Sequence, residues 1–139
     1  MSASKDIILL IDGTKQGPEK RRSEPTNIEG LAYFLNAEPL RRPDVSPRPL
    51  DGCAHLLASN SGAVVGYISG VGVDTLPVLD LFPGGTGYGM AYIIRLAYRF
   101  LITHYQPSDR IFLFGFSRGA FAVRSLAGFV DCVGVGLRV

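Results

Sequence analysis

Tryptophan is absent from this 139-residue sequence, and cysteine and histidine occur only twice each. The two cysteines, Cys53 and Cys132, are too few for a disulfide framework, and their spacing fits no zinc-binding pattern. Charged residues are sparse at 19%, and the net charge of +2 is too weak to indicate a nucleic-acid partner. We therefore expect reduced thiols in a cytosolic chain and no nucleic-acid ligand.

The sequence also lacks a long apolar run near its start. Residues 1–6 contain no basic segment followed by such a run, and the apolar residues 7–11 are too few for a signal sequence or a membrane span. We expect synthesis in the cytoplasm, and any export would not use a cleavable N-terminal signal. Two arginine-bearing stretches, residues 18–25 and 39–49, are typical of solvated loops, and the alternative is peripheral contact with anionic lipid headgroups.

The elements that are present alternate between strands and helices. A hydrophobic content of 47% over 139 residues is typical of one globular domain. The predicted strands cover residues 7–11, 63–69 and 110–114, and the predicted helices begin near residue 27 and cover residues 88–105 and 118–129. Residues 36–62, with four prolines, are expected to be a loop insertion. This order predicts an α/β fold of three layers with a mainly parallel sheet, open at its edge after the third strand.

A chemical motif follows the third predicted strand. The string Gly115-Phe116-Ser117-Arg118-Gly119 lies between this strand and a helix, which is the context that a nucleophile elbow requires. The two glycines would let strand and helix approach closely, and the serine hydroxyl would stand at the positive end of the helix. The backbone N–H of Arg118 is the first candidate oxyanion donor. The alternative is a serine that merely caps a helix.

A second oxyanion donor is expected from the turn after the first strand. Asp12-Gly13-Thr14 ends that strand at the same edge of the sheet, so the N–H of Gly13 or Thr14 is the candidate. The alternative is an ordinary turn at the end of a strand. Asp12 is interpreted as a residue that orients this turn through side-chain hydrogen bonds, not as a member of a catalytic triad.

Neither histidine is a strong candidate for the catalytic base. His104 closes the helix that leads into the third strand, which predicts a place at the amino edge of the sheet, away from Ser117. His55 lies in the long predicted loop, and its position is open. In serine hydrolases with this type of elbow, the acid and the histidine follow the serine in the chain. We therefore expect residues 1–139 to be a single incomplete domain.

These motifs resemble the type VI secretion lipase-effector family, an α/β-hydrolase family of bacteria and fungi. The resemblance is carried by Asp12-Gly13-Thr14, Tyr67 to Gly72, Tyr98-Arg99-Phe100-Leu101, residues 111–121 around the Gly-Phe-Ser-Arg-Gly elbow, and Arg124-Ser125-Leu126-Ala127-Gly128-Phe129. It covers most of the chain, which corresponds to the first part of the family's domain. One departure is Lys15, which stands where the family usually has tryptophan.

The resemblance implies a phospholipase or related carboxylic-ester hydrolase with Ser117 as its nucleophile. It implies no metal or organic cofactor, and a lipid or small ester as substrate. The acid and histidine of the family would come from a missing C-terminal portion. The alternative hypothesis is a non-catalytic fragment or pseudoenzyme that binds lipid or a protein partner.

Overall fold

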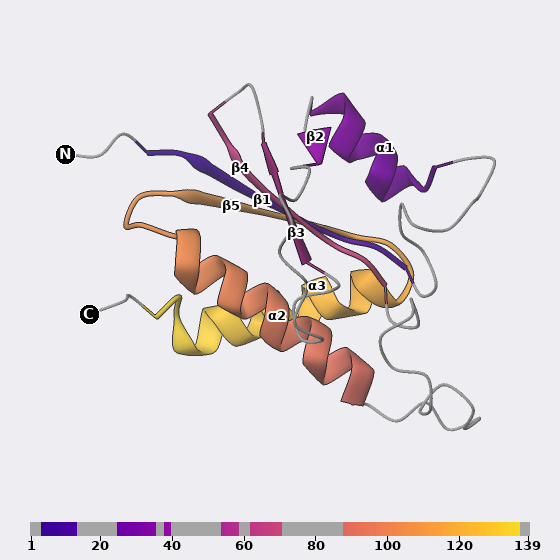
Figure 1. Cartoon of the computed structure of the whole chain (residues 1–139). Helices are drawn as coiled ribbons and strands as arrows, with labels where there is room; N and C mark the ends of the chain where they lie inside the picture. Colours follow the sequence, from indigo (N-terminus) through magenta and orange to yellow (C-terminus); the bar gives the residue numbers. More distant parts are fainter. Residues whose placement is uncertain are drawn as a thin grey trace, which may run out of the picture.

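The computed structural model describes residues 4–13, 25–35, 38–39, 54–58, 62–70 and 88–136. These residues build one five-stranded sheet in the order β2-β3-β4-β1-β5 (Figure 1). β1 (Asp6–Ile11) lies between β4 (Val64–Ile68) and β5 (Arg110–Gly115) and runs parallel to both. β3 (Ala54–Ala58) pairs antiparallel with β4, and β2 (Glu38–Pro39) pairs antiparallel with β3. The predicted parallel arrangement of the three central strands is confirmed, and β2 and β3 extend it by two antiparallel pairings.

Helices cover both faces of this sheet. α2 (Tyr88–His104) and α3 (Arg118–Val133) lie on one face, and α1 (Asn27–Phe34) lies on the other (Figure 1). Two separate apolar clusters fill the spaces between these layers. The predicted three-layer α/β fold is therefore confirmed.

The central strand β1 explains why its sequence is apolar without alternation. Ile7, Leu9 and Ile11 point into the cluster with α2 and α3. Ile8 and Leu10 point the other way, into the cluster with α1. Since side chains alternate between the two faces of a strand, a strand with helices on both sides needs apolar residues at every position.

The helices begin and pack as their sequence patterns predict. α1 starts with a capping box, in which the Glu29 N–H donates to Thr26 Oγ1 at 3.1 Å and the Thr26 N–H donates to Glu29 Oε2 at 2.9 Å. On α2, the stripe formed by Ile93, Ala97 and Leu101 is buried against β1 and its neighbours. This stripe has the period of 3.6 residues that puts one face of α2 on the core.

The expectation that residues 36–62 form only a loop is wrong at two places, because β2 and β3 lie inside this range. The β3 sequence, Ala-His-Leu-Leu-Ala, has no polar–apolar alternation, and alanine is uncommon in strands. Its strand conformation follows from pairing with β4, where Ala54 lies opposite Ile68 and Leu57 lies opposite Val65. That the range is an insertion stays a prediction, and its remaining residues lie outside the described ones, except Gly62.

Among the described strands, β5 stands at an open edge of the sheet, as expected. Phe112 and Phe114 pair with Ile8 and Leu10 of β1, so they lie on the face that α1 covers. α1 packs on β1 and β4, however, and leaves the two phenylalanines 39% and 40% exposed. The outer part of this face is therefore apolar and open to solvent in the described part of the chain.

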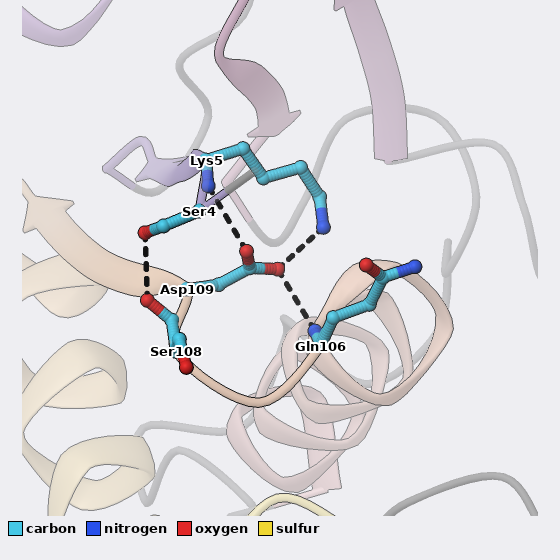
Figure 2. Close-up of polar contacts among 5 residues, drawn as sticks. All are labelled: Ser4, Lys5, Gln106, Ser108 and Asp109. Atoms are coloured by element: carbon cyan, nitrogen blue, oxygen red, sulfur yellow. Dashed lines mark hydrogen bonds and ion pairs between the residues drawn. The ribbon is translucent and has the colours of Figure 1, made fainter. Parts of the chain in front are cut away.

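At the amino edge of the sheet, a carboxylate joins the start of β1 to the turn before β5. Asp109 accepts hydrogen bonds from the Lys5 N–H at 3.0 Å and the Gln106 N–H at 2.8 Å, and it pairs with the Lys5 ammonium (Figure 2). The hydrogen bond from the Lys5 side chain lowers the pKa of Asp109. Beside it, Ser4 Oγ donates to the carbonyl of Ser108 at 2.7 Å, and Ser108 has a φ of 83°.

Candidate active site

The turn between β5 and α3 holds its serine in an unusual backbone conformation. β5 ends at Gly115 and α3 begins at Arg118, with Ser117 directly before the helix. Ser117 has φ 55° and ψ −122°, and its ψ is far from the left-handed helical values that side chains occasionally adopt. A conformation of this kind costs about 1–3 kcal/mol and persists only where the surrounding structure enforces it.

The two flanking glycines are what permit this tight turn. A Cβ at Gly115 would lie 2.5 Å from the carbonyl carbon of Gly119 and 2.7 Å from the N atom of Ala120. A Cβ at Gly119 would lie 2.7 Å from the carbonyl oxygen of Asp12, and closer still to that of Ile11. These neighbours are backbone atoms, which cannot turn aside as a side chain can. Only glycine permits this approach of α3 to β5 and β1.

The Ser117 side chain is not used to cap α3. Ser117 occupies the N-cap position, yet its side chain makes no capping hydrogen bond, and the residue is exposed. Its carbonyl accepts from Ala120 at 3.0 Å, as the first helical turn requires. The N–H groups of the first turn of a helix have no partner within the helix, and Arg118 is the first residue of α3. The serine hydroxyl and the Arg118 N–H therefore belong to the same positive helix end.

The turn after β1 lies beside this serine, as predicted. Ile11 pairs with Gly115, and the Phe116 N–H donates to the Ile11 carbonyl at 3.1 Å. On the other side, the Asp12 N–H donates to the Ile68 carbonyl at 2.9 Å. The backbone of residues 11–12 is thus held between β4 and the start of α3.

Asp12 has a buried carboxylate with three donors. Oδ1 accepts from the Gly13 N–H at 2.7 Å, and Oδ2 accepts from Thr26 Oγ1 at 2.7 Å and the Tyr67 hydroxyl at 2.6 Å. The residue is 1% exposed. Burial, and then the hydrogen bond to Asp12, raise the pKa of Tyr67 above its usual range. The sequence-based interpretation of Asp12 as a residue that orients the turn agrees with these contacts.

Of the two candidates for the second oxyanion donor, the structure describes only Gly13. The Gly13 N–H is engaged by the Asp12 carboxylate. Thr14 lies outside the described residues. Next to this turn is a hollow too small to hold a water molecule, at the carboxyl edge between β1 and the first turns of α2 and α3. It is lined by Ile11, Asp12, Gly70, Met90, Ile93, Arg118 and Gly119. The hollow therefore adjoins the residue that follows Ser117.

The sequence contains two histidines, and neither has its backbone next to Ser117. His104 ends α2 at the amino edge, with its ring 4.6 Å from that of Phe100, and burial, followed by the charge of Lys5, lowers its pKa. The six residues of β5 separate that edge from Ser117 by roughly 17 Å. The backbone of His55 lies on β3 opposite Tyr67, three strand spacings from β5, or roughly 14 Å to the side.

The described part of the chain has neither a metal-binding cluster nor a membrane-spanning helix. No group of three or more His, Cys, Asp or Glu residues there has an arrangement that could hold a metal ion. Within the same residues, no helix is both long enough and apolar enough to cross a membrane.

Comparison with known proteins places these features in a family. A family model described as the catalytic domain of Tle1-like phospholipase effectors of the type VI secretion system matches residues 5–138. The chain belongs to this family. Because the match runs over the turn after β1, the elbow and both central helices, the resemblance suggested by the sequence motifs is confirmed for the Tle1-like catalytic domain.

A curated relative of this Tle1-like chain comes from a eukaryote. It is "Uncharacterized protein YEL023C" from Saccharomyces cerevisiae, which is 56% identical over 136 residues. The alignment covers 96% of the chain and 18% of the relative, so the chain spans less than a fifth of that protein's length. No solved structure matches the chain.

The partners of Asp12 are the part of this site that sequence reasoning missed. The sequence predicts only that a helix begins near residue 27, and Tyr67 enters only as part of the family resemblance. Thr26 and Tyr67 lie 14 and 55 positions from Asp12, and no local spacing links them to it. The available signal was an aspartate directly after a buried strand, because a carboxylate there needs hydrogen-bond donors from other segments.

Proposed function

We propose that the protein is a serine hydrolase of lipid carboxylic esters, of the phospholipase or lipase type, with Ser117 as its nucleophile. In this mechanism Ser117 Oγ attacks the ester carbonyl while a base removes its proton. The Arg118 N–H donates to the tetrahedral oxyanion, together with an N–H from the turn of Gly13 and Thr14. The alcohol then leaves with a proton, and water hydrolyses the acyl-serine. Since the Gly13 N–H is engaged by Asp12, we favour Thr14 as the second donor.

The observation that carries this proposal is the backbone of Ser117. A serine that only capped a helix would use extended φ and ψ angles and would accept a hydrogen bond from the first turn. Ser117 has φ 55° and ψ −122° and makes no such bond. A helix cap does not need this strained backbone conformation. A nucleophile elbow does, because its serine hydroxyl stands on a sharp turn between strand and helix. Membership of a phospholipase family supports the choice of lipid esters.

We also propose that the base and acid that activate Ser117 come from outside residues 1–139. His104 lies at the opposite edge of the sheet, and the His55 backbone lies three strands away from β5. Residues 1–139 on their own are therefore expected to hydrolyse esters very slowly. Fast turnover by these residues that is lost in His55→Gln would overturn this part of the proposal and assign His55 as the base.

A non-catalytic role is the second candidate. It is favoured by the same separation of Ser117 from both histidines, and by the open edge at β5 with its exposed Phe112 and Phe114. In this case the protein would keep the backbone conformation of the elbow without its catalytic activity. It would bind lipid at a membrane surface, or a protein partner, without hydrolysing an ester.

The test is covalent labelling together with ester turnover. The protein, expressed from its full reading frame, is incubated with a fluorophosphonate probe, and the labelled residue is identified by mass spectrometry. Hydrolysis of a short-chain nitrophenyl ester and of phospholipid vesicles is measured in parallel. We expect the label on Ser117, and we expect Ser117→Ala to lose label and turnover by at least about 1,000-fold, since removing a catalytic nucleophile costs this much or more.

Ser108→Ala is the matched control. Ser108 and Ser117 are the two residues other than glycine with positive φ in the described part of the chain, but Ser108 lies at the amino edge. Ser108→Ala should keep both label and turnover. Turnover that survives in Ser117→Ala would refute the assignment of the nucleophile. A folded protein that binds vesicles but neither takes the label nor hydrolyses either ester would favour the non-catalytic role.

A further inference from the structure

The elbow around Ser117 packs directly against the backbone at the end of β1. Gly119, two residues after Ser117, approaches the carbonyl oxygens of Ile11 and Asp12 so closely that no Cβ fits between them. The Phe116 N–H, directly before Ser117, donates to the same Ile11 carbonyl at 3.1 Å. Both sides of Ser117 are therefore fixed relative to residues 11–12, and a shift of this backbone would move the serine.

The Asp12 side chain adds three hydrogen bonds to the backbone pairing that already holds this segment. It accepts all three of them. The donors are Gly13, which is the next residue, Thr26, which is the N-cap of α1, and Tyr67, which lies on β4. Thr26 is itself held by Glu29 in the capping box. The carboxylate thus ties the turn after β1 to a neighbouring strand and to a helix on the opposite face of the sheet from α3.

We infer that Asp12 is a positioning residue for Ser117. It does not contact the reacting atoms in this mechanism. It anchors Gly13 after β1, and through the Ile11–Asp12 backbone it holds the strained elbow and the Arg118 N–H in position. A carboxylate suits this task because both of its oxygens accept hydrogen bonds, and three donors from separate segments fix its position. The inference rests on the proposed function of Ser117.

The central test is Asp12→Asn, because asparagine keeps the size of the side chain but replaces one acceptor oxygen with a donor group. Gly13 donates its N–H to Oδ1, so the amide oxygen must face Gly13, and the amide NH2 then faces the Thr26 and Tyr67 hydroxyls. Both hydroxyls now donate to Oδ2, so in the variant these two hydrogen bonds must reverse direction. A misplacement of about 1 Å in an active site can reduce the rate by about 100-fold. We expect kcat for a soluble short-chain ester to fall by about 10- to 100-fold, with KM within about twofold of the wild-type value.

Two further variants separate positioning from stability. Tyr67→Phe removes one donor and leaves the carboxylate, so it should remain folded, lower kcat by about 3- to 10-fold, and leave KM unchanged. Asp109→Asn is the matched control, because Asp109 is also a carboxylate with several backbone and side-chain donors, but at the amino edge. It should lower the melting temperature and leave kcat within about twofold, measured well below the transition.

The outcomes distinguish this inference from the proposed function. If Ser117→Ala abolishes turnover while Asp12→Asn and Tyr67→Phe keep kcat within twofold, Ser117 remains the nucleophile and the positioning role is wrong. The same conclusion follows if Asp12→Asn loses activity only in proportion to the unfolded fraction, as seen in parallel by circular dichroism. If Ser117→Ala keeps full turnover, both proposals are wrong. A selective loss of kcat in folded Asp12→Asn and Tyr67→Phe supports the inference.

Discussion

Replacing Gly119 with alanine adds one methyl group at the tightest point of the fold. That methyl would lie 2.7 Å from the Asp12 carbonyl oxygen, and closer to that of Ile11, whereas ordinary contacts begin near 3.4 Å. The shortfall is about 0.7 Å or more against atoms of the central strand. Because β1 is bonded to strands on both sides, α3 must move instead, and with it the elbow.

The size of the effect is the difference between two opposing terms. Adding a methyl group to a well-packed site costs about 1–3 kcal/mol of stability. We expect a cost near about 3 kcal/mol, because the clashing atoms are rigid backbone atoms of Ile11 and Asp12. Alanine in place of glycine in a helix gains up to about 1 kcal/mol. We therefore expect Gly119→Ala to lower the free energy of unfolding by about 2 kcal/mol, and to reduce labelling of Ser117 by the fluorophosphonate probe.

Gly128→Ala is the matched control in the same helix. Nothing lies within 4 Å of a Cβ at Gly128, so only the helix-propensity term remains, and stability should rise by about 0.5–1 kcal/mol. Both free energies are measured by urea unfolding followed by circular dichroism. The reasoning is refuted if Gly119→Ala is as stable as the wild type, or if the two variants change stability in the same direction.

Two other predictions concern Asp109 and Ser117. The pKa of Asp109 is lowered by Lys5, so its bonds stabilise the fold above pH 4 or so, and this contribution disappears as the pH falls through the lowered pKa. Asp109→Asn should thus be less stable than the wild type at pH 7, by a margin that shrinks at pH 3; an equal margin at both pH values in urea unfolding would contradict this. Ser117→Gly should relieve the strain at φ 55° and melt at a higher temperature than Ser117→Ala by a margin corresponding to about 1 kcal/mol, and equal melting temperatures would argue against strain.

Sequence reasoning succeeded where a pattern is local. The continuous apolar run of β1, the capping box at Thr26 and the stripe of α2 each depend on residues within a few positions of one another, and all three are present in the structure. The motif around Ser117 was found for the same reason, since strand, turn and helix are consecutive. Its chemical role stays a prediction.

Sequence reasoning failed where pairing between distant segments decides the structure. β3 has a sequence with little preference for a strand, and its conformation comes from the ladder with β4. The position of His55 could not be predicted for the same reason, because it follows from the strand order and not from its neighbours in sequence. The link between Lys5 and Asp109 spans 104 positions and had no pattern to reveal it.

By itself the sequence determined the type of each central element and the place of the serine, because helical and strand periods and the glycine spacing act over short distances. Only the tertiary structure decided that Asp12 collects hydrogen bonds from Thr26 and Tyr67, and that Gly119 rests on the backbone of residues 11–12. These contacts depend on which strands lie next to each other. That order is set by the burial of both faces of β1, to which residues of β4, β5 and all three helices contribute.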